Sequence, residues 1–319
     1  RDAGAGLALG AGAYTLQSGC YFAALERVDA SLLALLVFTF PAMVAALERQ
    51  LDGIHRFRDR VLENAAIDEG DVVLDVGTGT GLIGFGALDL VGETGKVIFS
   101  DVSEELLDEC RRIAEDLGVL ARCHFVLASA DDLQAFEDAS VDVVTTRSVL
   151  IYLTDKRPAL REFFRVLRAN GRVSIFEPIN SFGYPEPDDL YQGFDATPIR
   201  ALAAKLRAVG VPPSEHPLLN FDERDLLAFA EEAGFREITL DYNAEVSFGP
   251  HWAAEVGWET YKRMSGNPLD PTLEEAMNEA LSEEERVEFE TYFRGLLESG
   301  AEINRRGATA YLRAVKRLG

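Results

Sequence analysis

The sequence is poor in cysteine and in basic side chains. Its 319 residues include only Cys20, Cys110 and Cys123, with no CxxC pair, which argues against a disulfide framework or a cysteine zinc site and favours a reducing compartment. Lys and Arg number 31 against 54 Asp and Glu, giving a formal net charge of −23 at pH 7. Such a chain repels phosphate backbones, and no local basic patch offsets the repulsion, so nucleic acid is not an expected partner.

Long hydrophobic runs are also scarce. The only stretch apolar enough to consider as a membrane segment is residues 31–47, SLLALLVFTFPAMVAAL. It is about a turn shorter than the ~20 residues of a spanning helix and contains Pro41 at its centre, so we expect a buried or subunit-interface helix instead. The opening residues lack a basic region followed by a clean apolar core, so we expect no signal peptide and a cytoplasmic protein.

A regular alternation of strands and helices begins near residue 71. Short runs that are apolar almost throughout are typical of strands buried on both faces, and they occur at residues 72–76, 96–101, 123–128, 141–146 and 172–177. Amphipathic stretches separate them; in SEELLDECRRIAEDLG, Ser103 can cap the helix start, Cys110 falls on the apolar face and Gly118 follows the end. The alternation predicts an α/β fold with a doubly wound parallel sheet.

Two long excursions and two further strands divide the chain. Strands are expected at 236–242 and 308–318, with a mainly helical stretch between them, and excursions of this size usually build the walls of a site. The predicted parts are residues 1–58 as a helical lid or oligomerisation segment, 59–242 as a core with an excursion at 178–220, 243–305 as a helical substrate cap, and 306–319 as the final core strand. A homodimer is compatible with this organisation.

The stretch VVLDVGTGTGLIGFGAL contains two overlapping glycine patterns. Asp75, Gly77, Gly79 and Gly81 form DxGxGxG, whereas Gly79, Gly81 and Gly84 form GxGxxG. A glycine turn after a buried strand lets the backbone approach a ligand at a helix N-terminus, so neither pattern is specific alone. A carboxylate at position 75 would repel a pyrophosphate and attract the ammonium of an amino-acid tail. This leaves an NAD-type oxidoreductase as a remote alternative.

Further stretches follow the glycine loop in order. Asp101 ends the second strand, where a carboxylate can accept both hydroxyls of a ribose. The third strand ends LASADDL, so that Ser129, Ala130 and Asp131 stand where an adenine edge could be bound; VDVVTTRSVLIYL and LREFFRVLRANGRVSIFEP come next. With VVLDVGTGTG, these stretches resemble the class I S-adenosylmethionine-dependent methyltransferases. The resemblance is close over residues 60–180, and the strands near 236 and 308 match the antiparallel sixth and seventh strands of that fold.

The resemblance implies a Rossmann-like seven-stranded sheet with an antiparallel last strand, and S-adenosylmethionine as cofactor. It implies that Gly77, Gly79 and Gly81 line the methionine part, with Asp75 near its amino group and Asp101 on the ribose. The full set of expected cofactor residues is Asp75, Gly77, Thr78, Gly79, Gly81, Asp101, Val102, Ser129, Ala130, Asp131 and Arg147. Many relatives have an acid where Ser129 stands, so the assignment among residues 129–131 is open.

The acceptor is less well indicated than the donor. Methyl transfer from a sulfonium needs mainly a nucleophile held in line, so a dedicated base is optional. The fourth strand ends TTRS instead of the NPPY type of amine methylators, no Pro-Cys nucleophile is present, and Asp142 stands at the wrong end of its strand for a catechol-type magnesium site. We therefore expect metal-independent O- or N-methylation of a small molecule. A cofactor-binding member that does not methylate, or has been repurposed, is the alternative.

Candidate substrate residues follow the strand ends or lie in the excursions. His251 is a candidate base, and the substrate-binding candidates are Tyr152, Glu177, Asn180 and Trp252. Single histidines are more often structural, so the competing interpretation makes His251 a surface cap and Trp252, Trp258 and Tyr261 helix-packing residues. His216 lies in a proline-rich stretch and is expected to be exposed.

Overall fold

The computed structural model describes residues 55–209, 215–250, 257–265 and 270–317. The predictions made for residues 31–47, His251 and Trp252 lie outside the described residues. The chain divides into two units at Arg58, and the unit from Arg58 onward is compact. Everything described from Arg58 onward belongs to the second unit.

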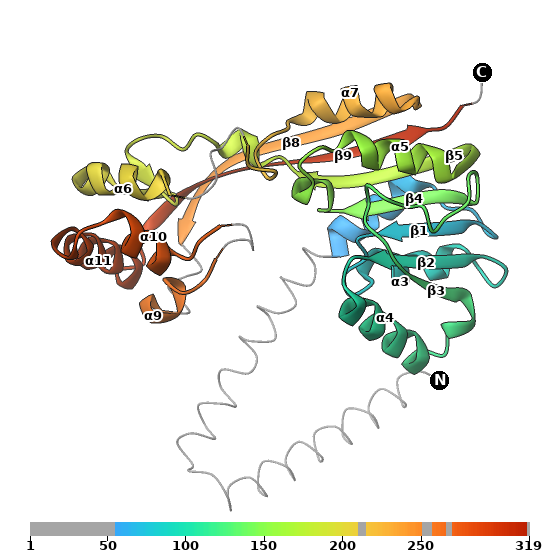
Figure 1. The fold of residues 1–319 in the computed structure, drawn as a ribbon, viewed down its shortest axis with the longest axis horizontal. Helices are drawn as coiled ribbons and strands as arrows, with labels where there is room; N and C mark the ends of the chain where they lie inside the picture. The colour runs from blue at the N-terminus through green and yellow to red at the C-terminus, as the bar shows by residue number, and fades with distance from the viewer. Residues whose placement is uncertain (1–54, 210–214, 251–256, 266–269, 318–319) are drawn as a thin grey trace, which may run out of the picture. The chain divides into compact units, whose positions relative to one another are not determined.

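A seven-stranded sheet in the order β3-β2-β1-β4-β5-β9-β8 organises the second unit (Figure 1). Its strands are β1 (Val72–Val76), β2 (Lys96–Asp101), β3 (Cys123–Leu127), β4 (Val141–Arg147), β5 (Leu167–Pro178), β8 (Arg236–Pro250) and β9 (Glu302–Val315). The first five run parallel, and β9 is antiparallel to both β5 and β8. This confirms the predicted Rossmann-like sheet with its antiparallel last strand.

Helices cover both faces of the sheet. They are α3 (Leu82–Leu90), α4 (Glu104–Asp116), α5 (Arg157–Val166) and α7 (Glu223–Ala233), with short 3-10 turns η1 (Leu120–Arg122), η2 (Leu150–Tyr152), η3 (Asn180–Gly183) and η4 (Thr197–Ile199). On one face, Leu160 of α5 and Leu226 of α7 share a core with Leu74 and Val144. On the other face, α3 and α4 pack against β2 and β3, together with helical residues 58–65. Because helices cover both faces, the apolar strands are buried on both sides.

The helix ends follow the expected capping chemistry. The Ser103 hydroxyl accepts from the Leu106 backbone N–H at 3.2 Å, and Gly118 after α4 has φ of 71°. Asp222 and Asp225 form a capping box at the start of α7, and Gly234 ends that helix with φ of 105°. The sequence signals for these two helices are confirmed.

The β8–β9 hairpin continues well beyond the expected strand ends, since pairing runs on to Pro250 and Glu302. The additional stretches are mostly exposed; residues 242–248 alternate between apolar and polar side chains, a strand pattern that was assigned to the helical cap in the sequence. Around the tip lie α6 (Arg200–Arg207), α9 (Trp258–Tyr261), α10 (Leu273–Ala280), α11 (Glu283–Glu298) and the small hairpin of β6 (Leu190–Tyr191) and β7 (Phe194–Asp195). They share a second apolar core, here called the cap core.

Three side chains near the cap show which sequence interpretations hold. Trp258 and Tyr261 are buried in the cap core, which confirms that both are packing residues. The exposed position expected for His216 is wrong: the residue is buried, its Nε2 lies 2.9 Å from an Asp270 carboxylate oxygen, and its Nδ1 accepts from a backbone N–H. The excursion therefore folds back against the cap through a polar contact that proline content alone does not reveal. None of the described helices has the length and apolar character needed to cross a membrane.

Candidate functional site

The glycine loop after β1 has one open position and several packed ones. Gly77, Gly79 and Gly81 have φ values of 63°, 56° and 85°, a region that favours glycine. A Cβ added to Gly79 would meet no atom within 4 Å, whereas one on Gly81 would lie 2.4 Å from the Phe85 ring and one on Gly84 2.4 Å from the Phe99 ring. Gly79 is therefore the point where a ligand can approach the backbone. Gly84 is a close-packing glycine, as its place outside the DxGxGxG pattern predicts.

Asp75 holds the glycine loop in place through hydrogen bonds on its buried side. Its side chain is buried; one carboxylate oxygen accepts from the Thr145 hydroxyl at 2.8 Å, and the other from the Thr78 hydroxyl at 2.6 Å and the Gly84 N–H at 3.0 Å. Burial raises the pKa of Asp75 to about 6, against the opposing effect of these three hydrogen bonds. Both oxygens are occupied inside the protein, so the carboxylate fixes the loop and places its charge beneath it.

The peptide units at Gly79 are held on both sides. Asp101 accepts from the Gly79 N–H at 2.9 Å and, through its other oxygen, from the Ser103 N–H at 3.1 Å. The Cys110 thiol donates to the Gly79 carbonyl at 3.2 Å, and burial raises the pKa of that thiol to about 12. Cys110 is buried as its helical spacing predicts, but the sequence offered no signal for its contact with the loop. These bonds leave the Gly79 α-carbon free to face a ligand.

The loops after β2 and β3 lie next to one another at the same edge. Val102, directly after Asp101, is 72% exposed although it is apolar. The Ala128 N–H donates to the Asp101 carbonyl at 3.0 Å, which ties the two loops together. Beyond it the Ser129 hydroxyl donates to the Asp131 carboxylate, with buried Ala130 between them. Ser129 and Asp131 thus act as one polar pair.

The loop after β4 is held by a buried acid. Glu177 is fully buried at the end of β5, and its carboxylate accepts from the N–H groups of Val149 and Leu150 at 2.9 Å and of Ile151 at 3.3 Å. Burial raises the pKa of Glu177 to about 7. Glu177 therefore anchors η2, which brings Val149 against Gly77, where an added Cβ would lie 2.3 Å from a Val149 methyl. The other described candidates are Tyr152, the last residue of η2, and Asn180, the first residue of η3, and both are exposed.

Lys156 is a buried lysine that the sequence analysis did not single out. Its ammonium donates to the carbonyls of Leu153 at 2.6 Å and Pro217 at 2.8 Å, and also to the Asn220 side chain. Burial lowers the pKa of Lys156 to about 8. The contacts tie the start of α5 to the end of the excursion. A lysine beside a helix start normally indicates an exposed position, so only the fold identifies it.

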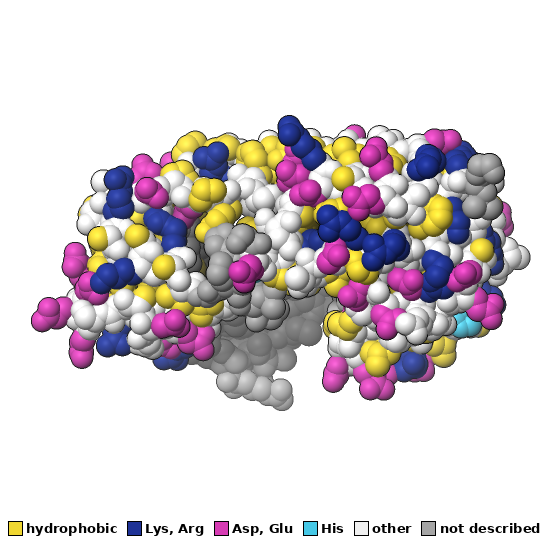
Figure 2. Space-filling model, turned by 45° about the horizontal axis from the view of Figure 1, so that its top comes forward, with side chains coloured by type: hydrophobic (Ala, Val, Ile, Leu, Met, Phe, Trp, Pro, Cys, Tyr) yellow, Lys and Arg dark blue, Asp and Glu magenta, His cyan; other side chains and the backbone are white. Residues whose placement is uncertain are grey.

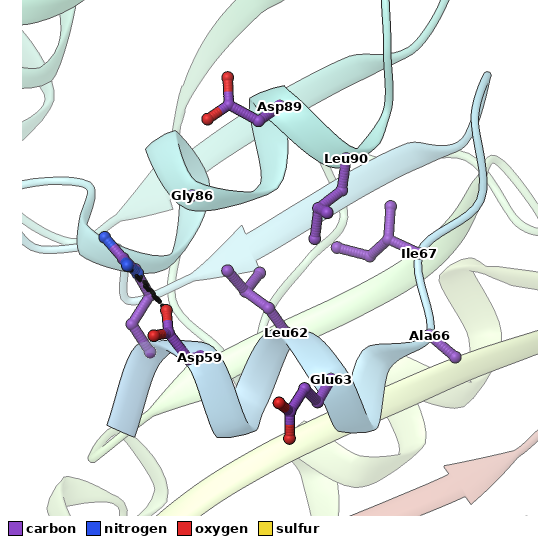
Figure 3. Close-up of a pocket in the computed structure, with 9 residues that line it drawn as sticks. Asp59, Leu62, Glu63, Ala66, Ile67, Gly86, Asp89 and Leu90 are labelled. Carbon is purple, nitrogen blue, oxygen red and sulfur yellow. Dashed lines mark hydrogen bonds and ion pairs between the residues drawn. The ribbon is translucent and has the colours of Figure 1, made fainter. Parts of the chain in front are cut away.

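A separate cavity of about 480 Å³ lies between α3 and helical residues 58–65 (Figure 3). Leu62, Ile67 and Leu90 form its apolar wall, and Asp89 lies at its rim. It borders the C-terminal half of α3, away from the glycine loop, and contains none of the predicted site residues. Within the described part of the chain, no three His, Cys, Asp or Glu side chains are placed to hold a metal ion.

Comparison with known proteins agrees with this architecture. Residues 67–195 match the family model described as a methyltransferase domain. The chain is 32% identical over 197 residues to the ubiquinone/menaquinone biosynthesis C-methyltransferase UbiE of Escherichia coli. The aligned region covers 58% of this chain and 75% of UbiE, and the UbiE of Shigella boydii serotype 18 gives the same values. The fold is similar to that of the YcgJ protein of Bacillus subtilis, with a TM-score of 0.52, 20% identity, and coverage of 83% of this chain and 100% of that one. The chain belongs to the class I S-adenosylmethionine-dependent methyltransferases, and S-adenosylmethionine is its methyl donor.

Proposed function

We propose that this methyltransferase transfers the methyl group to an O or N atom of a small molecule, without a metal ion. The observation that carries the proposal is the loop at Gly79, whose peptide groups are fixed by Asp101 and Cys110 while its α-carbon stays open. A fixed and open backbone lets the donor be held in one orientation. Orientation and proximity then supply much of the rate of a transfer that needs no dedicated base.

The donor would extend along the carboxyl ends of the parallel strands. Its methionine part would lie over the glycine loop, its ribose hydroxyls against Asp101, and its adenine between exposed Val102 and the Ser129–Asp131 pair. The proposed donor-contacting residues are Gly77, Thr78, Gly79, Gly81, Asp101, Val102, Ser129, Ala130, Asp131 and Arg147. Asp75 would act on the ammonium through its charge beneath the loop, because both of its oxygens are already hydrogen-bonded.

A small acceptor is favoured by the charge and by the relatives. The face shown in Figure 2 carries Lys and Arg side chains interspersed with acidic ones, in a chain of net charge −23, which is unsuited to phosphate backbones. UbiE is named a C-methyltransferase of ubiquinone/menaquinone biosynthesis. Carbon is therefore the second candidate for the acceptor atom. Residues 243–305 are proposed as a substrate cap, with Tyr152 and Asn180 as substrate contacts in a cytoplasmic enzyme.

Calorimetric titration with S-adenosylhomocysteine, the product of the donor, tests the donor site. We expect binding of this nucleoside and none of NAD. Asp101→Asn should weaken binding about tenfold or more, since the carboxylate serves both Gly79 and the ribose. The control Asp108→Asn, at an exposed position on α4, should leave binding unchanged. Failure of the wild-type protein to bind the nucleoside would contradict the proposed site.

Incubation of cell extract with a donor carrying a ¹³C methyl group tests the acceptor. We expect the label in a low-molecular-mass product. The ¹³C chemical shift of that product distinguishes O-, N- and C-methylation. Label found in a protein or nucleic acid would overturn the proposal of a small acceptor.

A further inference from the structure

A row of side chains crosses the sheet beside the glycine loop. Arg147, the last residue of β4, is in register with Phe176 of β5; Phe176 is in register with Tyr311 of β9, and Tyr311 with Asp241 of β8. Register partners project to the same face of a sheet. Thr145, two residues before Arg147 and hence on that face, hydrogen-bonds Asp75. The row therefore lies on the face where the glycine loop turns into α3, at the carboxyl edge where α/β sheets bind ligands.

The Tyr311 ring is fixed from two sides. Its centroid is 4.9 Å from that of Phe176, and the Arg60 guanidinium carbon lies 5.7 Å from it. Arg60 is itself paired with Asp241 at 2.5 Å, so its charge is already balanced. Burial raises the pKa of Tyr311, with Arg60 and Arg147 acting in the opposite direction. The phenol is therefore protonated at neutral pH, and it can donate a hydrogen bond.

Arg147 is a half-buried arginine for which the described residues supply neither a hydrogen-bond nor an ion-pair partner. Arg207 also has an unpartnered Nε, but its Nη2 donates to the carbonyls of Asp188 and Leu190. In Arg172, by comparison, the guanidinium Nη2 lies 2.6 Å from a carboxylate oxygen of Asp71. A buried donor left without a partner costs about 1–3 kcal/mol. In a chain with 54 acidic residues, a cation at a ligand-binding edge for which the described residues supply no counter-ion indicates an anion that comes with a ligand.

We propose that Arg147 and Tyr311 bind an ionised oxygen of the methyl acceptor, which makes small organic acids, acidic phenols and enols the substrate class of this enzyme. The inference rests on the proposed function and adds the chemistry of the acceptor to it. The guanidinium has five N–H donors, so a contact with the carboxylate of the methyl donor leaves others available. Tyr311 is not among the predicted donor contacts, which makes it the residue specific to the acceptor.

The charge on Arg147 also indicates where the methyl group goes. An oxygen bound to a guanidinium is a weaker nucleophile, so the bound oxygen is the recognition group and a neighbouring atom reacts. The electron pair of that neighbouring O, N or conjugated carbon forms the bond to the methyl carbon. The carbon–sulfur bond breaks, its electron pair stays on sulfur, and the sulfonium becomes a neutral thioether. The acceptor atom then loses its proton to water.

Binding of two probes of nearly identical shape tests the anion site. In the complex with S-adenosylhomocysteine at pH 7.5, wild-type protein should bind benzoate, which is ionised, about ten times more tightly than neutral benzamide. Arg147→Gln should abolish this preference and Tyr311→Phe should reduce it severalfold. Arg313→Gln is the control, because Arg313 is an exposed residue on the same strand and face as Tyr311, two positions further from the edge. Unchanged thermal midpoints would show that the variants fold.

Two outcomes overturn the proposal. One is the absence of any preference for benzoate in the wild-type complex, including no binding at millimolar concentration. The other is a preference for benzoate that persists in both variants, together with a selective effect of Arg147→Gln on the donor. In that case Arg147→Gln would weaken the binding of S-adenosylhomocysteine but not that of 5′-methylthioadenosine, which lacks the amino-acid part. Arg147 would then serve only the donor, and the proposed methyl transfer would stand. Loss of S-adenosylhomocysteine binding by the wild-type protein would instead refute the donor site. Once a substrate is known, Tyr311→Phe should raise KM more than it lowers kcat.

Discussion

Replacing Asp75 by Asn should stabilise the ligand-free protein at neutral pH. Asn has the same shape and no charge. Its amide oxygen can accept from the Thr78 hydroxyl and the Gly84 N–H, while the Thr145 hydroxyl turns to accept from the amide nitrogen. The hydrogen bonds are thus retained in number. The change mainly removes a buried negative charge.

The size of the effect follows from the pKa of Asp75. Burial raises it from 3.8 to about 6, so the folded state binds more protons than the unfolded state between these two values. The free energy of unfolding therefore falls as pH rises through this window, and the loss is complete above pH 6. A shift of about two units corresponds to about 3 kcal/mol. Asp75→Asn should be more stable than wild type by up to that amount at pH 7.5, and equally stable near pH 3.5.

Urea unfolding of the ligand-free protein at the two pH values measures this difference. Thr145→Val is the matched control, because it removes one hydrogen bond and leaves the charge. It should lower stability at neutral pH, where Asp75→Asn raises it. The Asn variant should also bind S-adenosylhomocysteine more weakly, since the ammonium of the ligand loses the charge beneath the loop. An Asn variant less stable than wild type at pH 7.5 would refute the reasoning that burial dominates the pKa of Asp75.

Five further variants at four positions test the supports of the site. Glu177→Ala leaves three backbone N–H groups without their acceptor and should cost about 3 kcal/mol or more, whereas Glu177→Gln should cost less; equal losses in urea unfolding would contradict this. Gly84→Ala places a Cβ 2.4 Å from the Phe99 ring and should lower stability by about 1–3 kcal/mol. The Cβ of Gly79→Ala meets no atom within 4 Å, but the substitution strains the backbone at φ of 56°, so it should cost about 1–2 kcal/mol and also weaken the binding of S-adenosylhomocysteine in calorimetry. The pKa of Lys156 is lowered from 10.5 to about 8, so the free energy of unfolding of the wild-type protein should rise with pH between these values. A Lys156→Met variant that kept the same rise would exclude Lys156 as its source.

Features that depend on neighbouring residues were predictable from the sequence. The five parallel strands, the cap at Ser103, and the packing role of Gly84 all follow from short-range patterns of burial and turn chemistry. The doubly wound order then follows because short connections between buried parallel strands leave few arrangements. The extended end of β8 was missed although Tyr242, Ala244, Val246 and Phe248 alternate with polar residues as in a strand, because the stretch from residue 243 onward was assigned to the helical cap.

Features that depend on register between distant segments were not predictable. Tyr311 shares a face of the sheet with Arg147, with Phe176 between them, only because β9 pairs with β5, which in turn pairs with β4. The same holds for the thiol of Cys110 on the Gly79 carbonyl and for Lys156 beneath the excursion. A single sequence contains no information on such contacts beyond the type of residue. Each of these three residues has an ordinary alternative position that its local pattern fits equally well.

Asp75 favours the methyl donor through its charge and not through direct contact with it. From the sequence, its carboxylate is expected next to a ligand ammonium; in the structure it is buried and both of its oxygens accept hydrogen bonds from the protein. A buried charge still acts across the loop, because a medium of low polarisability screens it less than water does. The preference for a cationic amino-acid tail over a pyrophosphate therefore does not require direct contact. What it requires is that Asp75 be ionised, and with a pKa of about 6 a bound cation would favour that ionisation and release a proton. Binding of the donor should accordingly strengthen as pH rises from 5 to 7, most steeply near the pKa of Asp75.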